Sequence, residues 1–237
     1  MKKQILILLI LSLHFSCGDG EKMDNNLIDQ KIRGHVKEIT ETSFDVKESF
    51  GEVKKDGVKN KKEQKFNKSG NITESNKYDE NGELINKSTY KYDKDGNKTE
   101  NNIYDENGEL INKYTIKYDK DGNITESNIY NKDGKLTDKY TFKYDKDENI
   151  TEQDTYDENG ELTNKYTYKY DKDGNTTESN IYDENGELTK LQYEYEYDKK
   201  KNWTVRKIAY LININLTDST DEDYKISYIT ERKITYY

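Results

Sequence analysis

A repeat of 26 residues runs through the centre of this chain. Each period carries the phrases Y-D-E-N-G-E-L and Y-D-K-D-G-N, or close variants of them. The tyrosines of the second phrase are Tyr92, Tyr118, Tyr144 and Tyr170, with Phe66 one period earlier and Tyr197 one residue late. Those of the first phrase are Tyr78, Tyr104, Tyr130, Tyr156 and Tyr182. A fixed period of this length predicts one supersecondary unit stacked against copies of itself.

The segment from Leu110 to Tyr118 alternates in the manner of a β-strand. Leu110, Tyr114, Ile116 and Tyr118 fall on one face, and lysines and threonines occupy most of the other. Period-two alternation predicts one buried and one hydrated face. Each period therefore contains two such strands, joined as a hairpin.

Turn phrases bound these strands. Asp-Glu-Asn-Gly and Asp-Lys-Asp-Gly recur between them, and Asn or Asp followed by Gly suits the positive φ of a tight hairpin. Eleven turn positions between residues 67 and 201 predict about twelve strands, with more at each end. The extra residue between Leu188 and Tyr197 predicts a β-bulge near Thr189–Leu191.

The expected fold is all-β: an antiparallel meander of 26-residue hairpin units in a single twisted or coiled sheet that wraps its tyrosine face inward. The expected organisation is a signal peptide (1–16), a lipid-anchored tether (17–33), N-terminal capping strands (34–64), the hairpin repeats (65–198) and C-terminal capping strands (199–237). The caps alternate but lack the turn phrases, as terminal repeats commonly do.

The first residues have the features of an export signal. Two lysines precede the apolar run Ile5–Leu11, and the single cysteine, Cys17, follows Ser16. This arrangement resembles the acylation site of bacterial lipoproteins, in which the cysteine becomes the lipid-bearing N-terminus. The alternative is an ordinary cleaved signal with an unused thiol. Without a second cysteine, no internal disulfide can form.

Charge argues against one class of partner. The whole chain has a net charge of −9, and removal of Lys2 and Lys3 with the signal changes it to −11. Such a balance repels phosphate backbones, so nucleic acid is not an expected partner.

The phrase Y-D-K-D-G-N-I-T at 118–125 and its relatives resemble the YD repeat of RHS-type proteins over roughly residues 65–210. The flanks, including N-W-T-V-R at 202–206, resemble small lipoproteins of the Bacteroidota. The resemblance implies a β-repeat protein of the cell envelope, anchored in the outer membrane of a Gram-negative bacterium. Large RHS proteins wind such repeats into a hollow shell around a toxin domain. This chain has too few repeats to close a shell of that kind and carries no toxin domain.

Three kinds of chemistry were considered for the polar residues. Asp119, Asp121, Asn123 and Glu126 have some of the spacing of a calcium loop, but turn formation explains the same residues. Glu100, Glu126, Glu152 and Glu178 could be acids of a glycoside hydrolase, yet equivalent surroundings favour a ladder of charges paired with lysines. His35 is the only histidine outside the signal. We expect no enzyme activity, no metal and no cofactor.

The tyrosine face is the remaining candidate site. Core packing explains most of it, and a ligand groove is the alternative. The candidate residues are Tyr114, Tyr118, Tyr140, Tyr144, Tyr166, Tyr168, Tyr170 and Trp203. The leading prediction is a non-enzymatic, lipid-anchored protein that presents a β-repeat surface to an unknown protein or glycan. A carbohydrate-binding module is the alternative, since stacked aromatic faces bind sugars, and a glycoside hydrolase is a distant third.

Overall fold

The computed structural model describes residues 32–49, 52–211 and 224–237, so the signal peptide, Cys17 and nearly all of the tether lie outside the described residues. It contains fourteen strands and, within the described residues, no helix. The strands are β1 (Val36–Ser49), β2 (Glu52–Phe66), β3 (Ile72–Tyr78), β4 (Leu84–Tyr92), β5 (Lys98–Asp105), β6 (Leu110–Tyr118), β7 (Ile124–Asn131), β8 (Leu136–Tyr144), β9 (Ile150–Asp157), β10 (Leu162–Tyr170), β11 (Thr176–Asp183), β12 (Leu188–Tyr197), β13 (Trp203–Leu211) and β14 (Tyr224–Tyr236).

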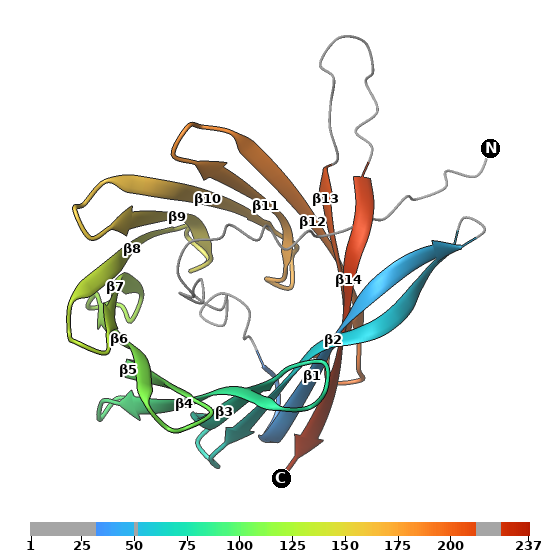
Figure 1. Cartoon of the computed structure of the whole chain (residues 1–237), viewed down its shortest axis with the longest axis horizontal. Helices are drawn as coiled ribbons and strands as arrows, with labels where there is room; N and C mark the ends of the chain where they lie inside the picture. Colours follow the sequence, from blue (N-terminus) through green and yellow to red (C-terminus); the bar gives the residue numbers. More distant parts are fainter. Residues whose placement is uncertain (1–31, 50–51, 212–223) are drawn as a thin grey trace.

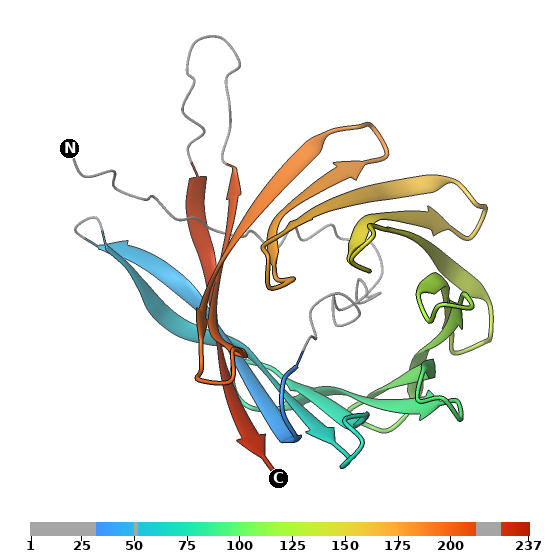
Figure 2. The same cartoon turned by 180° about the vertical axis from the view of Figure 1, so that it is seen from behind.

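The strands form an antiparallel meander, as predicted, but the expected single open sheet is wrong. Each strand pairs with its neighbours in sequence, and β1 also pairs with β14, which closes a barrel. Figures 1 and 2 show the strands as a ring, with the blue β1 beside the red β14. Closure requires no further repeats, because the two non-repeat ends supply the last staves. It satisfies the backbone groups of both free edges, which an open sheet would expose.

The turn phrases form turns, as predicted. In the turn between β6 and β7, Gly122 has a φ of 89° and its N–H donates to the carbonyl of Asp119 over 3.2 Å. The Asp119 carboxylate accepts the N–H groups of Asp121 and Asn123, both over 2.9 Å. The same contacts recur around the barrel. All turns of the D-K-D-G kind lie at one end, called the DKDG rim below, and all turns of the D-E-N-G kind lie at the other, the DENG rim.

The extra residue of β12 is absorbed differently from the predicted bulge near Thr189–Leu191. Most repeats do have a register shift there: in β8, Tyr130 faces Leu136 but Ile129 faces Asp138. Between β11 and β12 the register runs without a shift, from Tyr182–Leu188 to Glu178–Gln192. The strand therefore loses one bulge residue and gains two residues at its far end. This exchange keeps the tyrosines of β12 in phase.

The regular bulge also corrects the expected face of one residue in each repeat. Ile103 faces Asn112, whereas the next residue, Tyr104, faces Leu110. Because consecutive residues of a strand point to opposite faces, Leu110 lies on the face opposite to Tyr114. The leucines of the D-E-N-G-E-L phrase thus accompany the tyrosines of that phrase on the outside of the barrel.

The core lies inside the barrel. One buried cluster of Val36, Ile39, Phe66 and Ile72 packs where the chain ends meet. A second comprises Ile103, Tyr114, Ile129 and Tyr140, with Ile111 and Phe142 against it. Small buried polar residues separate these larger side chains, including Gln64, Ser75, Ser127 and Ser179. Tyrosine therefore supplies much of the packed area that a chain with only 30% apolar residues otherwise lacks.

Candidate functional site: a tyrosine-lined cavity at one rim

The two faces of the barrel wall differ sharply in chemistry. Strand register places Tyr140 opposite Ser127 and Thr155, and Tyr166 opposite Ile181, on the inward face. The alternate residues, such as Lys117, Glu126 and Lys139, face outward. A barrel that spans a bilayer needs an apolar outer band about 25 Å tall. Here most of the outer wall is lysine, glutamate, asparagine and threonine, which suits contact with water.

The repeated glutamates form the predicted ladder of charges with lysines. Glu126 binds Lys117 at 2.6 Å and Lys139 at 2.7 Å, one from each neighbouring strand, and Glu100 binds Lys91 and Lys113 in the same way. These lysines lower the pKa of Glu74, Glu100 and Glu126 to about 2. A general acid needs a raised pKa. The ladder therefore does not have the electrostatics of the glycoside hydrolase alternative.

We expect the ladder to make stability depend on acid pH. The folded-state pKa of Glu126 lies near 2, below the usual 4.5. Its contribution is therefore complete above pH 4.5 and is lost as the pH falls towards 2. Glu126→Gln should cost no more than about 1 kcal/mol at pH 7, because its lysine partners are exposed to solvent. Urea melts at pH 7, 4 and 2.5 should show a smaller acid loss in this variant. An identical acid loss in both proteins, or one that 1 M salt leaves unchanged, would contradict the ladder.

At the DKDG rim, the phrase tyrosines hold neighbouring hairpins together. The hydroxyl of Tyr118 donates to the carbonyl of Lys98 over 2.8 Å, and Tyr144 donates likewise to Ile124 over 2.9 Å. Tyr92 and Tyr170 repeat the contact to Ile72 and Ile150. The ladder between β5 and β6 ends at Glu100–Thr115, short of Lys98. The tyrosine hydroxyl thus binds a carbonyl beyond the end of the ladder. Burial raises the pKa of Tyr92, Tyr118 and Tyr144 to about 12.

These four tyrosines line a cavity of about 460 Å³. It extends across the inside of the barrel from β2 to the turn after β10 and reaches the turn residues Gly70, Gly122 and Gly174. Its apolar lining consists of Ile32, Phe66, Ile72, Ile124 and Ile150 besides the tyrosines, and its charged lining consists of Lys98 and Glu148. Ligand pockets of proteins typically have volumes of roughly 300–1,000 Å³. The cavity is therefore the candidate binding site.

The sequence-predicted ligand residues divide into three groups. Tyr118, Tyr144 and Tyr170 line the cavity. Tyr114 and Tyr140 are only 5% exposed and belong to the core, while Tyr166 and Tyr168 face inward with a pKa raised by burial. Trp203 is not part of the cavity. It is buried, with the guanidinium of Arg232 3.4 Å from its ring centre and Tyr195 beside it.

Sequence reasoning missed Tyr92, Phe66 and the isoleucines as lining residues. The signal was present in the period: residues six positions after each phrase aromatic are Ile72, Lys98, Ile124, Ile150 and Thr176. Without the closed barrel, nothing indicated that these positions meet around one space. Lys98 stands out, because a lysine occupies a position that is isoleucine in three of the five periods.

A buried ion pair lies at the seam where β1 meets β14. Arg232 Nε donates to Glu41 Oε1 over 2.9 Å, and the two residues are paired in register. Burial raises the pKa of Glu41, but Arg232, Lys62 and Arg206 outweigh this effect and lower it. The carboxylate therefore stays ionised inside the barrel.

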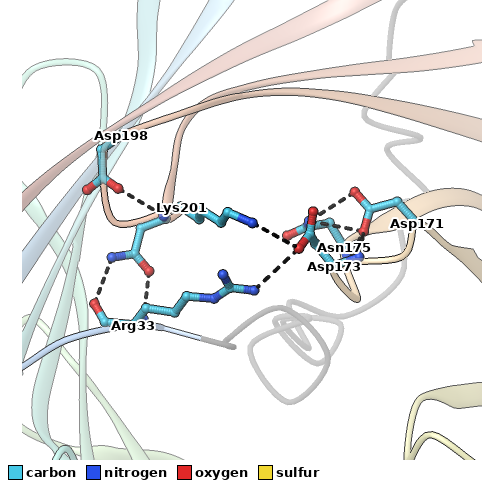
Figure 3. Close-up of polar contacts among 7 residues, drawn as sticks. Arg33, Asp171, Asp173, Asn175, Asp198 and Lys201 are labelled. Carbon is cyan, nitrogen blue, oxygen red and sulfur yellow. Dashed lines mark hydrogen bonds and ion pairs between the residues drawn. The ribbon is translucent and has the colours of Figure 1, made fainter.

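A second polar cluster fixes the start of the described chain to the DKDG rim (Figure 3). The side chain of Asn202 accepts the N–H of Arg33 over 2.7 Å and donates to its carbonyl over 2.8 Å. The Arg33 guanidinium and the Lys201 ammonium both approach Asp173, at 3.7 and 3.6 Å. The chain therefore joins the barrel at the same rim that carries the cavity.

The calcium alternative has little support in the turn. Both Asp119 oxygens are engaged by groups of the same turn, Asp121 binds Lys120, and Glu126 lies in the outer ladder. Among the residues that the structure describes, no cluster of three or more acidic, histidine or cysteine side chains could hold a metal ion.

The outer wall has one apolar element, confined to the DENG rim. Tyr104 faces Leu110, Tyr130 faces Leu136, and Tyr182 faces Leu188 on this surface. Leu162 and Leu188 are about half exposed. Within the described ranges, no helix has the length and hydrophobicity needed to cross a membrane.

Comparison with known proteins gives structural likenesses only. No protein-family model and no curated protein matches the chain. A porin-like protein from Bacteroides uniformis aligns with 84% of this chain and 98% of its own, at 14% identity and a TM-score of 0.49. A porin-like protein from Bacteroides vulgatus aligns with 86% of this chain and 99% of its own, at 12% identity and a TM-score of 0.43. The Tc holotoxin pore of Photorhabdus luminescens aligns with 69% of this chain but 12% of its own, at 12% identity and a TM-score of 0.18. The chemistry of the barrel itself therefore has to indicate the function.

Proposed function

We propose that this protein is a non-enzymatic, lipid-anchored barrel of the cell envelope that binds a ligand in its interior. The observation that carries the proposal is the cavity of about 460 Å³ at the DKDG rim, enclosed by a wall that is charged outside and aromatic inside. A wall of this kind stands in water and offers its apolar surface only to what enters the barrel.

The anchor and the family belong to the same proposal. The motif around Cys17 supports acylation, and the repeated Y-D-K-D-G-N phrase supports membership of a small, YD-repeat branch of RHS-like lipoproteins. The binding surface in this proposal is the inside of the barrel, and the ring of turns forms its entrance. The absence of an enzyme role is proposed from the electrostatics of the repeated glutamates, each held ionised by lysines.

A carbohydrate ligand is the alternative, and the tyrosine rings favour it. The hydrogen-bonding groups favour it less. Sugars are recognised by donors and acceptors around the ring stack, but the hydroxyls of Tyr92, Tyr118, Tyr144 and Tyr170 donate to backbone carbonyls.

Metabolic labelling with a palmitate analogue tests the anchor. The wild-type chain should take up label and sediment with membranes, and Cys17→Ser should lose both properties. Ser16→Ala, one residue away, should keep both. A wild-type chain that never takes label, or a Cys17→Ser chain that still sediments with membranes, would remove the lipoprotein from the proposal.

A further inference from the structure

We infer that the cavity binds a single hydrocarbon chain, and that the chain enters through the DKDG rim from the membrane to which the protein is anchored. This inference rests on the proposed function and names the ligand of the same site. It has three parts: the apolar lining, the engagement of the polar groups, and the side at which the tether joins the barrel.

The first part is the chemistry of the lining. Phe66, Ile72, Ile124 and Ile150 alternate with the four tyrosines around the cavity, and Ile32 closes one side. Burial of hydrocarbon against such side chains is favourable in proportion to the area removed from water. The alternation places a ring edge or an isoleucine on every hairpin from β2 to β11, so the apolar contact continues around the space.

The second part is how the polar groups at the cavity are used. The four tyrosine hydroxyls bind backbone carbonyls, and the side-chain amides of Asn123 and Asn149 bind Asp119 and Asp145 of their own turns. A polar ligand would have to displace these bonds, and a buried polar group left without a partner costs free energy. A hydrocarbon chain leaves all of them intact.

The third part is access. Ile32 lines the cavity, and Arg33 is fixed to Asn202 at the DKDG rim. Cys17 lies 15 residues before Ile32 (32 minus 17), a length that spans at most about 50 Å when fully extended. An acylated Cys17 would therefore hold this rim, rather than only the far rim, within reach of the bilayer.

Binding of an uncharged fluorescent probe, N-phenyl-1-naphthylamine, tests the ligand class. The whole chain carrying Cys17→Ser is used, so that no covalent lipid competes. The probe should bind, dodecanol should displace it, and maltohexaose should not. Ile124→Asp places a charge in the lining and should weaken probe binding at least tenfold. The matched control Thr125→Asp, at the exposed neighbouring position, should leave it unchanged. Absence of probe binding, displacement by maltohexaose alone, or equal affinity in both variants would overturn the inference.

Lys98→Ile guards against a folding defect in the first variant, because isoleucine already occupies the equivalent position in three other periods. It enlarges the apolar lining and should tighten probe binding by a factor of about three. Weaker binding would count against a hydrocarbon ligand.

The membrane source is tested with phosphatidylethanolamine vesicles that contain the probe. The anchored wild-type chain should take up probe faster than the Cys17→Ser chain at equal protein concentration. Equal rates would overturn entry from the membrane. Because palmitate labelling decides the anchor and probe binding decides the ligand class, failure of one does not conceal failure of the other.

Discussion

Replacement of Arg232 by methionine is expected to lower the free energy of unfolding by about 3 kcal/mol. Arg232 is 7% exposed, binds Glu41 and lies against the ring of Trp203. Its loss leaves the Glu41 carboxylate buried, with only Lys62 and Arg206 near enough to stabilise the charge. Urea melts followed by the fluorescence of Trp203, the only tryptophan, measure the effect directly.

A double-mutant cycle separates the ion pair from simple packing. Glu41→Leu combined with Arg232→Met removes both charges and should recover most of the stability that the single variant loses. Lys233→Met, at the exposed neighbouring position of β14, should be nearly silent. A double variant that is as unstable as the sum of the two singles would mean that the pair does not stabilise the seam.

The sequence could predict the strands, the turns and the face to which the tyrosines point, because all three depend on local alternation and on residues such as Gly122 that recur in each period. Closure of the barrel could not be predicted in this way. It depends on β1 and β14, which lack the turn phrases and pair Val36 with Tyr236 across nearly the whole described chain. A strand edge that will find a partner has the same pattern as one that remains free.

The candidate site follows the same division. Tyr118, Tyr144 and Tyr170 could be named from the repeat, since they occupy one position in successive periods. Their hydroxyl partners could not, because each lies 20 residues earlier, beyond the end of a ladder whose extent is set by the bulges. The face of Leu110 was wrong for the same reason: a bulge beside the turn reverses the alternation.

Gly122→Val is expected to lower the free energy of unfolding by about 2 kcal/mol, through the backbone alone. Gly122 has a φ of 89°, which a β-branched residue strongly disfavours, yet a Cβ at this position would meet no atom within 4 Å. The cost is therefore conformational and not steric. Lys120→Ala in the same turn should be nearly silent, because its only recorded contact is an exposed ion pair with Asp121. Equal, negligible losses in both variants would contradict the turn.

The position of the glycine along the chain distinguishes a closed barrel from an open array. In an open array each repeat touches only its neighbours, so Gly186→Val, near the end of the repeats, should cost less than Gly122→Val. In the barrel the strands on either side of Gly186 have partners on both edges, and its φ is 80°, so the two losses should be equal. Glu148 provides the reverse experiment, since it holds a φ of 63° where the other repeats have glycine. Glu148→Gly should raise the free energy of unfolding by about 0.5–1 kcal/mol, the relief of a left-handed backbone less the entropy of glycine. A smaller loss at Gly186, together with no gain at Glu148, would show that stability follows position along an array and not the geometry of equivalent turns in a ring.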